Sequence, residues 1–241
     1  MCAWKGVGAA AATMTVLCAV AAQAGAVGPD NPSFLLFGGT DLWRDGAFLN
    51  GGLLWSPAGL DKGGFTFKLL LAGGRYVYPS SGLATDVDGT LLSASALPGL
   101  RMTRDGLTAD FYVGPIVQDY RLTPYDPASL LRGSYAGAQF ATDLWYRPNP
   151  ATIIALDGSI ASIALIGSAR AAVGWRSSPA SFFIGPETQL LWCTDYQQLR
   201  FGAHVTNFRI DALQWSAAAG LEIESFHRSG AYLRIGFNSR L

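Results

Sequence analysis

The 241-residue sequence predicts an antiparallel transmembrane β-barrel of about twelve strands, with ten and fourteen strands as alternatives. From about residue 33 to the end, short segments of alternating apolar and polar residues follow one another, each closed by a Gly, Pro, Asp or Ser turn. A strand points successive side chains to opposite faces, so alternation gives one apolar and one polar face. Half of the residues are hydrophobic and only 14% are charged. No apolar run after the N-terminal leader is long enough for a membrane helix, and this combination is typical of a membrane barrel.

The N-terminus has the features of a secretion signal. Lys5 precedes an Ala-rich apolar run from Gly6 to Ala22, and Ala22-Gln23-Ala24 fits the small-x-small rule for cleavage. We expect residues 1–24 to be a removed signal peptide and residues 25–241 to form one outer-membrane barrel domain. A retained membrane anchor is the alternative, but the apolar run is shorter than the roughly 20 residues that a spanning helix needs.

Charge and cysteine content narrow the function classes. Removal of Lys5 with the leader leaves 16 of the 17 basic residues against 17 acidic residues, which is close to neutral. This near-neutral charge gives no indication of a nucleic-acid partner. The mature chain keeps Cys193 as its single cysteine, so no internal disulfide is expected.

Twelve strands are expected in chain order, each to within about two to four residues at its ends. They are 33–43, 46–56, 64–78, 89–102, 106–122, 133–147, 151–161, 166–176, 180–192, 197–209, 212–225 and 230–241. Segment 151–161 has the weakest pattern. An even number is favoured because both ends of a bacterial barrel normally lie in the periplasm.

Several segments separate their two faces cleanly. In 64–78, Leu69 and Leu71 oppose Lys68, and in 230–241, Leu233 and Ile235 oppose Arg234 and Asn238. The connections between segments are all short, so no folded plug or extracellular binding domain is expected.

The polar faces are expected to point inward, because Arg or Lys on the lipid face costs about 2–4 kcal/mol near the bilayer midplane. The candidate lumen residues with charged or polar side chains are Lys68, Arg101, Asp110, Gln139, Asp143, Asp157, Arg170, Glu187, Arg200, His204, Glu222 and Arg234. Their charges are of both signs. Two interpretations stay open: a ladder of ion pairs across a narrow lumen, which we favour, and a selective conduit.

An outer-membrane enzyme is the strongest competing class. Ser229, His227 and Glu224 supply a nucleophile, a base and an orienting acid in sequence, although a solvated turn is the simpler interpretation. The two histidines and the single mature cysteine have no metal-ligand spacing, and we expect neither a metal nor a cofactor. A soluble periplasmic β-sandwich is the third class, disfavoured because its buried faces usually carry larger residues than the many Gly and Ala of this chain.

Several motifs run in order along nearly the whole mature chain. They are Phe37–Trp43 (FGGTDLW), Gly51–Pro57 (GGLLWSP), Tyr120–Pro124 (YRLTP), Ala169–Trp175 (ARAAVGW), Gly185–Glu187 (GPE) and Gln198–Thr206 (QLRFGAHVT). In order and spacing they resemble the cellulose biosynthesis protein BcsS family of alphaproteobacteria. The resemblance implies membership of a cellulose synthesis and secretion gene set and an envelope location. It brings no catalytic residues.

Together, the pattern and the resemblance predict a non-enzymatic accessory of cellulose production in the outer membrane of a Gram-negative bacterium. Such a protein exports the glucan or anchors the secretion complex. The alternatives are an outer-membrane enzyme that modifies lipid A or polysaccharide, and a general porin-like channel. The expected partners are outer-membrane lipid, the cellulose chain and other secretion components. If a glucan crosses the lumen, inward Tyr112, Tyr120 and Trp145 are the candidate stacking residues.

Overall fold

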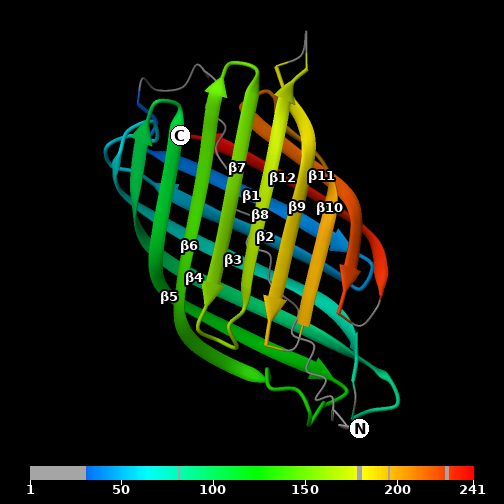
Figure 1. Ribbon diagram of the computed structural model, residues 1–241. Coiled ribbons are helices and arrows are strands. Elements are labelled where there is room, and N and C mark those ends of the chain that lie inside the picture. The colour runs from blue at the N-terminus through cyan, green and yellow to red at the C-terminus, as the bar shows by residue number, and fades with distance from the viewer. Residues whose placement is uncertain (1–30, 81, 178–180, 195, 226–227) are drawn as a thin grey trace, which may run out of the picture.

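The computed structural model describes residues 31–80, 82–177, 181–194, 196–225 and 228–241. These residues form twelve β-strands joined by short connections (Figure 1). The strands are β1 (Phe34–Trp43), β2 (Gly46–Trp55), β3 (Gly64–Pro79), β4 (Asp86–Arg104), β5 (Leu107–Thr123), β6 (Gly133–Asn149), β7 (Thr152–Ala161), β8 (Gly167–Arg176), β9 (Phe183–Cys193), β10 (Tyr196–Ile210), β11 (Leu213–Glu224) and β12 (Ser229–Arg240). Among the described residues, no helix is long and apolar enough to cross a membrane.

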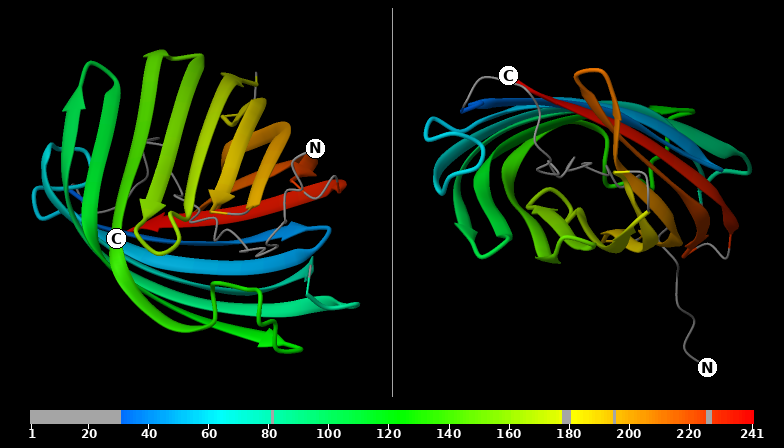
Figure 2. Two further views of the ribbon diagram at one scale, coloured as in Figure 1. Left: turned by 60° about the horizontal axis from the view of Figure 1, so that its bottom comes forward. Right: turned by 90° about the horizontal axis from the view of Figure 1, so that it is seen from above.

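The twelve strands close into one antiparallel barrel. Each strand pairs with its neighbours in sequence, and β12 returns to pair with β1 (Figure 2). The backbone amides of Ser33 and Phe34 both donate to the carbonyl oxygen of Leu241 at 3.1 Å. Residue 33 and the C-terminus therefore lie at one rim, which we call the terminal rim, and the opposite edge is the far rim. The predicted fold class is confirmed.

The strand ends differ most from the prediction at the start of β9, which is Phe183 instead of residue 180, and at the start of β4, which is Asp86 instead of residue 89. Asp86 and Asp88 read as turn residues in sequence, yet β3 and β4 continue to pair as far as Pro79↔Asp86. The Asp88 carboxylate accepts two hydrogen bonds from Arg75 across this pair, at 2.7 and 2.8 Å. A cross-strand ion pair of this kind lets acidic residues occupy strand positions.

Across the middle of the barrel, burial follows the alternation with apolar side chains outside and polar side chains inside. On β3, Leu69 and Leu71 are exposed while Lys68 is only 3% exposed. The outward apolar positions run from 65 to 73 on β3 and from 92 to 102 on β4, which is nine and eleven residues. A tilted strand needs about 9–11 residues to cross a bilayer. We call this surface the apolar band.

Strands β3, β4, β5 and β6 are longer than the band requires, with 16, 19, 17 and 17 residues. Their excess lies at the far rim and comprises 74–79, 86–91, 118–123 and 133–135, with the connection 124–132. We call this part the far-rim extension. Its outward face carries Arg75, Thr90 and Arg121, whereas its inward face carries Tyr76 and Tyr120. The polarity of the two faces is therefore the reverse of that in the band.

Three clusters of buried apolar residues occupy the interior near the rims. The far-rim cluster joins the extension to the opposite wall and contains Phe48, Ala72, Tyr76, Tyr78, Val87, Leu91, Ile116, Tyr120, Leu131, Ala161, Ile163, Ile166, Cys193 and Tyr196. Two clusters lie toward the terminal rim: Leu35, Phe37, Leu54, Leu60, Leu70, Leu97, Tyr112 and Ala141 on one side, and Trp145, Ile153, Ala155, Ala172 and Phe183 on the other.

Interior glycines allow this packing. A Cβ at Gly89 would lie 2.2 Å from the ring of Tyr76, and a Cβ at Gly99 would lie 2.4 Å from the ring of Tyr112. In both pairs the glycine stands opposite the aromatic residue in the sheet register. Only glycine permits such close approach, so these two positions let the rings lie flat against the inner wall.

Candidate functional site

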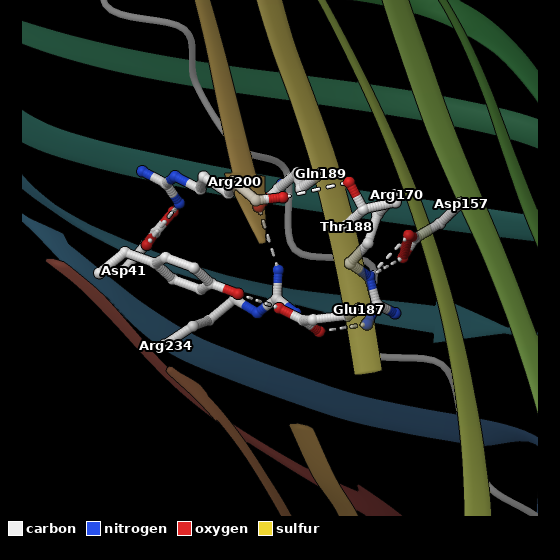
Figure 3. A network of polar contacts seen from close by, with 9 residues as sticks. Asp41, Asp157, Arg170, Glu187, Thr188, Gln189, Arg200 and Arg234 are labelled. Carbon is white, nitrogen blue, oxygen red and sulfur yellow. Dashed lines mark hydrogen bonds and ion pairs between the residues drawn. The ribbon is translucent and has the colours of Figure 1, made fainter. Parts of the chain in front are cut away.

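The interior polar network of the barrel is the candidate site, and Glu187 on β9 is one of its centres (Figure 3). The Glu187 carboxylate accepts hydrogen bonds from Arg234 at 2.6 Å, from Tyr232 at 2.9 Å and from Arg170 at 3.2 Å. Arg170 also donates its Nε to both oxygens of Asp157, at 3.0 and 2.8 Å. Side chains from β8, β9 and β12 therefore meet at one buried carboxylate, and Arg170 links this centre to Asp157 on β7.

Arg200 on β10 is a second centre and is only 1% exposed. Its Nη1 donates to both oxygens of Asp41 on β1 at 2.9 and 2.8 Å, and its Nε lies 3.7 Å from a carboxylate oxygen of Glu222 on β11. The guanidinium also lies 5.2 Å from the ring centroids of Trp43 and Tyr232. A buried charge requires such pairing and hydrogen bonding, since unpaired burial is costly.

The β3–β6 wall carries two further ion pairs. Arg101 donates from Nε and Nη2 to the two oxygens of Asp110, each at 2.7 Å, and also donates to the carbonyl oxygen of Leu60. Lys68 pairs with Asp143, and its Nζ lies 4.2 Å from the centroid of the Tyr112 ring. The first pair joins adjacent strands β4 and β5, and the second joins β3 to β6.

The structure places the predicted lumen residues in the barrel interior and pairs most of the charged ones with one another. Those buried are Lys68, Arg101, Asp110, Tyr112, Tyr120, Gln139, Trp145, Glu187, Arg200, His204, Glu222 and Arg234, whereas Asp143 and Arg170 are partly buried. Tyr112, Tyr120 and Trp145 do not share a surface, because each belongs to a different apolar cluster.

The residues predicted from the sequence to line the lumen do not include Asp41 and Tyr232, which are part of the network. Both follow from alternation, since Asp41 lies on the same face of β1 as buried Phe37, and Tyr232 lies on the same face of β12 as Arg234. Their partners, Arg200 and Glu187, are 159 and 45 residues away in sequence. The strand pattern can therefore reveal the inward position but not the partner.

A cavity of about 40 Å³ lies beside this network, lined by residues that include Trp145, Arg170, His204 and Arg234. A water molecule needs about 10–15 Å³ of such space, so the cavity has room for a few waters. The Nδ1 atom of His204 and the Nε1 atom of Trp145 are buried without a hydrogen-bond partner in the described part of the chain. Bound water is the natural partner for both atoms.

Two of the three side chains proposed for an enzymatic triad, Ser229 and Glu224, lie on opposite faces of the sheet. Ser229 pairs with Ile223 and is exposed, so it lies on the outer face. Glu224, the residue after Ile223, is buried on the inner face. The Glu224 carboxylate accepts a hydrogen bond from Tyr196 at 3.0 Å. His227 lies outside the described residues, as does the predicted signal peptide. Among the described residues, no three His, Cys, Asp or Glu side chains come together as metal ligands.

Comparison with solved structures finds several barrels of low sequence identity. The KdgM porin is 10% identical, with a TM-score of 0.43, over 86% of this chain and 99% of that chain. The translocator domain of the autotransporter NalP from Neisseria meningitidis is 12% identical, with a TM-score of 0.47, over 88% of this chain and 90% of that chain. The β domain of the Bordetella autotransporter BrkA is also 12% identical, with a TM-score of 0.47, over 88% and 100% of the two chains. Similarities this distant carry no inference about function.

A search of curated proteins finds no match. The model of one protein family, described as cellulose biosynthesis protein BcsS, matches residues 35–241. The match begins within β1 and continues through β12, so it covers the whole barrel. The family resemblance read from the sequence motifs is thus confirmed, and the chain belongs to the cellulose biosynthesis protein BcsS family.

Proposed function

We propose that the protein is a non-enzymatic outer-membrane accessory of cellulose biosynthesis, which anchors the secretion complex and does not conduct the glucan through its interior. The family supports a part in cellulose biosynthesis. The remaining elements of the proposal are the location, the closed interior and the absence of catalysis, and each is supported by a separate feature of the barrel.

The apolar band supports the membrane location. Leucines such as Leu49, Leu71 and Leu221 are 68%, 64% and 68% exposed, and the band is nine to eleven residues tall on β3 and β4. In water this surface would be an aggregation hazard, because monomeric soluble proteins rarely expose large contiguous apolar patches. In a bilayer the same surface is solvated by lipid, and closure of the sheet satisfies the backbone groups that lipid cannot.

The packing of the described interior residues is the observation that carries the anchoring role. Ion pairs centred on Glu187 and Arg200 occupy the middle, and the far-rim cluster packs inner-wall residues of β2 to β5 against Ile163, Cys193 and Tyr196 from the opposite wall. The cavity beside His204 has a volume of about 40 Å³, which has room for a few waters and not for a glucan chain. Opening a path would require breaking buried ion pairs, which is strongly destabilising.

The inner face supports a structural role more than a catalytic one. Glu187 is held by Arg170, Arg234 and Tyr232, and Arg200 is held by Asp41 and Glu222. Because these groups pair with one another, their role is to hold strands together. A catalytic site would instead present a reactive group toward a space that a substrate can enter.

Deletion of the gene with the synthase left intact tests this proposal. The measurement is the amount of cellulose outside the cell against the amount retained in the envelope. We expect surface cellulose to fall and retained polymer to rise. We expect Tyr112→Leu and Trp145→Leu variants, which remove the stacking rings, to restore the normal distribution, because neither side chain contacts polymer. Unchanged distribution after deletion would overturn the cellulose role. Failure of both variants, at normal outer-membrane levels, would overturn anchoring in favour of conduction.

A further inference from the structure

A groove of about 830 Å³ crosses β2 to β6, and its exposed lining belongs to the outer face of the barrel. The large side chains of its lining are the exposed Leu49, Leu71, Leu92 and Val117. The residues between them are small and are Gly51, Gly73, Ala94 and Ala136. The outward-facing polar lining lies on the far-rim side and consists of Asp119 and Ser134, whereas Asn50, Ser93 and Gln118 line the groove from inward-facing positions.

The floor of the groove is open at Gly51. A Cβ placed there would have one neighbour within 4 Å, the carbonyl oxygen of Phe37 at 3.6 Å, which is ordinary van der Waals contact. Gly51 does not adopt a positive φ, so the backbone does not itself require glycine. The small residue therefore leaves space above the sheet for a hydrocarbon chain lying among the leucines.

A row of polar side chains stands at the far-rim end of this groove. Thr90 on β4 pairs with Arg75 on β3 and with Arg121 on β5, so the three residues form one row across the sheet on the outward face. Adjacent strands are about 4.8 Å apart, which puts the two arginine Cα atoms about 10 Å apart with the threonine hydroxyl between them. The arginine side chains are 69% and 78% exposed.

Each arginine is oriented by a carboxylate and has further N–H donors that make no hydrogen bond within the described part of the chain. Arg75 uses Nε and Nη2 on Asp88, at 2.7 and 2.8 Å. Arg121 uses Nε on Asp119 at 3.0 Å, and Asp119 also accepts a hydrogen bond from Ser134 at 2.8 Å. A guanidinium has five N–H donors. Within the described part of the chain, Nη1 of Arg75 and both terminal nitrogens of Arg121 therefore remain available to a ligand.

We propose that the groove and the row together bind one membrane lipid with a phosphorylated sugar headgroup, with an acyl chain in the groove and a phosphate between Arg75 and Arg121. The proposal rests on the outer-membrane placement proposed above. Both ends of the barrel lie at the terminal rim, and bacterial barrels carry their short turns and termini on the periplasmic side. The far rim then faces the outer leaflet, whose characteristic lipid carries phosphates on an acylated disaccharide.

The nearby carboxylates determine how this site recognises its ligand. Asp88 and Asp119 balance the two arginines, so the row is nearly neutral and long-range attraction is weak. Recognition then depends on directed hydrogen bonds from the guanidinium groups, bidentate from the two terminal nitrogens of Arg121 and from Nη1 alone of Arg75. Binding should accordingly depend only weakly on salt concentration, unlike binding driven by a net positive patch.

Native mass spectrometry of the full chain in detergent tests the site, with lipid A, dephosphorylated lipid A and phosphatidylglycerol as probes. We expect lipid A to bind and the double variant Arg75→Gln/Arg121→Gln to bind it about tenfold more weakly or worse, because charge-assisted hydrogen bonds are lost. Gly51→Leu, which fills the open floor, should weaken binding as well. The matched control is Arg104→Gln, which removes an exposed arginine paired with Asp105 at the terminal rim and should bind normally.

Equal binding of lipid A by the double variant and the wild type would overturn the site. Equally tight binding of the dephosphorylated form would overturn the phosphate contact, and equally tight binding of phosphatidylglycerol would overturn the choice of the outer-leaflet lipid. All variants are first tested for heat-dependent gel mobility, so that only folded barrels are compared. A negative result on folded protein removes the lipid site and leaves the proposed role in cellulose secretion untouched.

Discussion

On strands β3 to β6, the apolar band and the far-rim extension distribute polarity in opposite directions. On β3, the band places Leu71 outside and Lys68 inside, whereas a few residues later the extension places Arg75 outside and Tyr76 inside. The period of two is the same in both regions. What changes is the surroundings. In the proposed membrane placement, the band has lipid outside and ion pairs inside, whereas the extension has water outside and a packed cluster inside. Strand geometry thus fixes the period, and the solvent on each side fixes which face is apolar.

The largest expected effect on stability comes from the ion pairs in the interior, which the apolar band encloses. Arg200→Met leaves Asp41 and Glu222 buried without their cation, so we expect a loss of about 3–5 kcal/mol in the free energy of unfolding. The same change at Arg75, an exposed arginine of the extension, should cost far less, because surface ion pairs contribute little. Urea unfolding in lipid vesicles, followed by tryptophan fluorescence, measures both. Similar losses for the two variants would mean that the interior network is not buried as described.

Two adjacent leucines of β4 lie on opposite faces of the sheet. One is in the apolar interior of the extension, and the other is on the apolar exterior of the band. Leu91 is fully buried in the far-rim cluster, and Leu92 is 54% exposed beside the groove. We expect Leu91→Ala to destabilise the barrel by about 2–5 kcal/mol through a cavity, and Leu92→Ala to have little effect. The same unfolding assay applies. If Leu92→Ala were the more damaging change, the assignment of inner and outer faces would be reversed.

A new charge on the outer face distinguishes the two regions along a single strand. Leu71→Arg places a guanidinium in the band and should cost about 2–4 kcal/mol, whereas Val77→Arg in the extension should cost about 0–1 kcal/mol, as near an interface. Both positions are on the outer face of β3. Insertion into vesicles and unfolding free energy are the readouts. Equal penalties would place the extension inside the bilayer.

A smaller effect is expected from one hydroxyl in each region. The hydroxyl of Tyr78 donates to the fully buried carboxylate of Asp126 at 2.9 Å, so Tyr78→Phe should cost about 1–3 kcal/mol. The hydroxyl of Tyr112 is buried without a hydrogen-bond partner in the described residues, so Tyr112→Phe should be nearly neutral. A measurable loss at Tyr112 would indicate an ordered water or ligand at that hydroxyl.

The sequence was sufficient to predict the fold and the family, because alternation and turn residues are local signals. It also indicated which side chains point inward, as at Glu187 and Arg234. It could not give the partners of those side chains, since the contact between Arg200 and Asp41 depends on closure of the sheet across 159 residues. The reversal of polarity in the far-rim extension was not predicted either. Asp86 and Asp88 resemble turn residues until their pairing with β3 is known.

The conductance of the purified protein in planar lipid bilayers tests the central claim, that the barrel interior is closed by ion pairs and apolar clusters. Trp145→Ala is a useful companion, because it removes a large side chain from a terminal-rim cluster and leaves the ion pairs in place. We predict that the wild type inserts without producing stable current steps at neutral pH. Stable steps from the wild type, reduced by a soluble glucan oligomer, would contradict the closed interior and identify the barrel as a conduit.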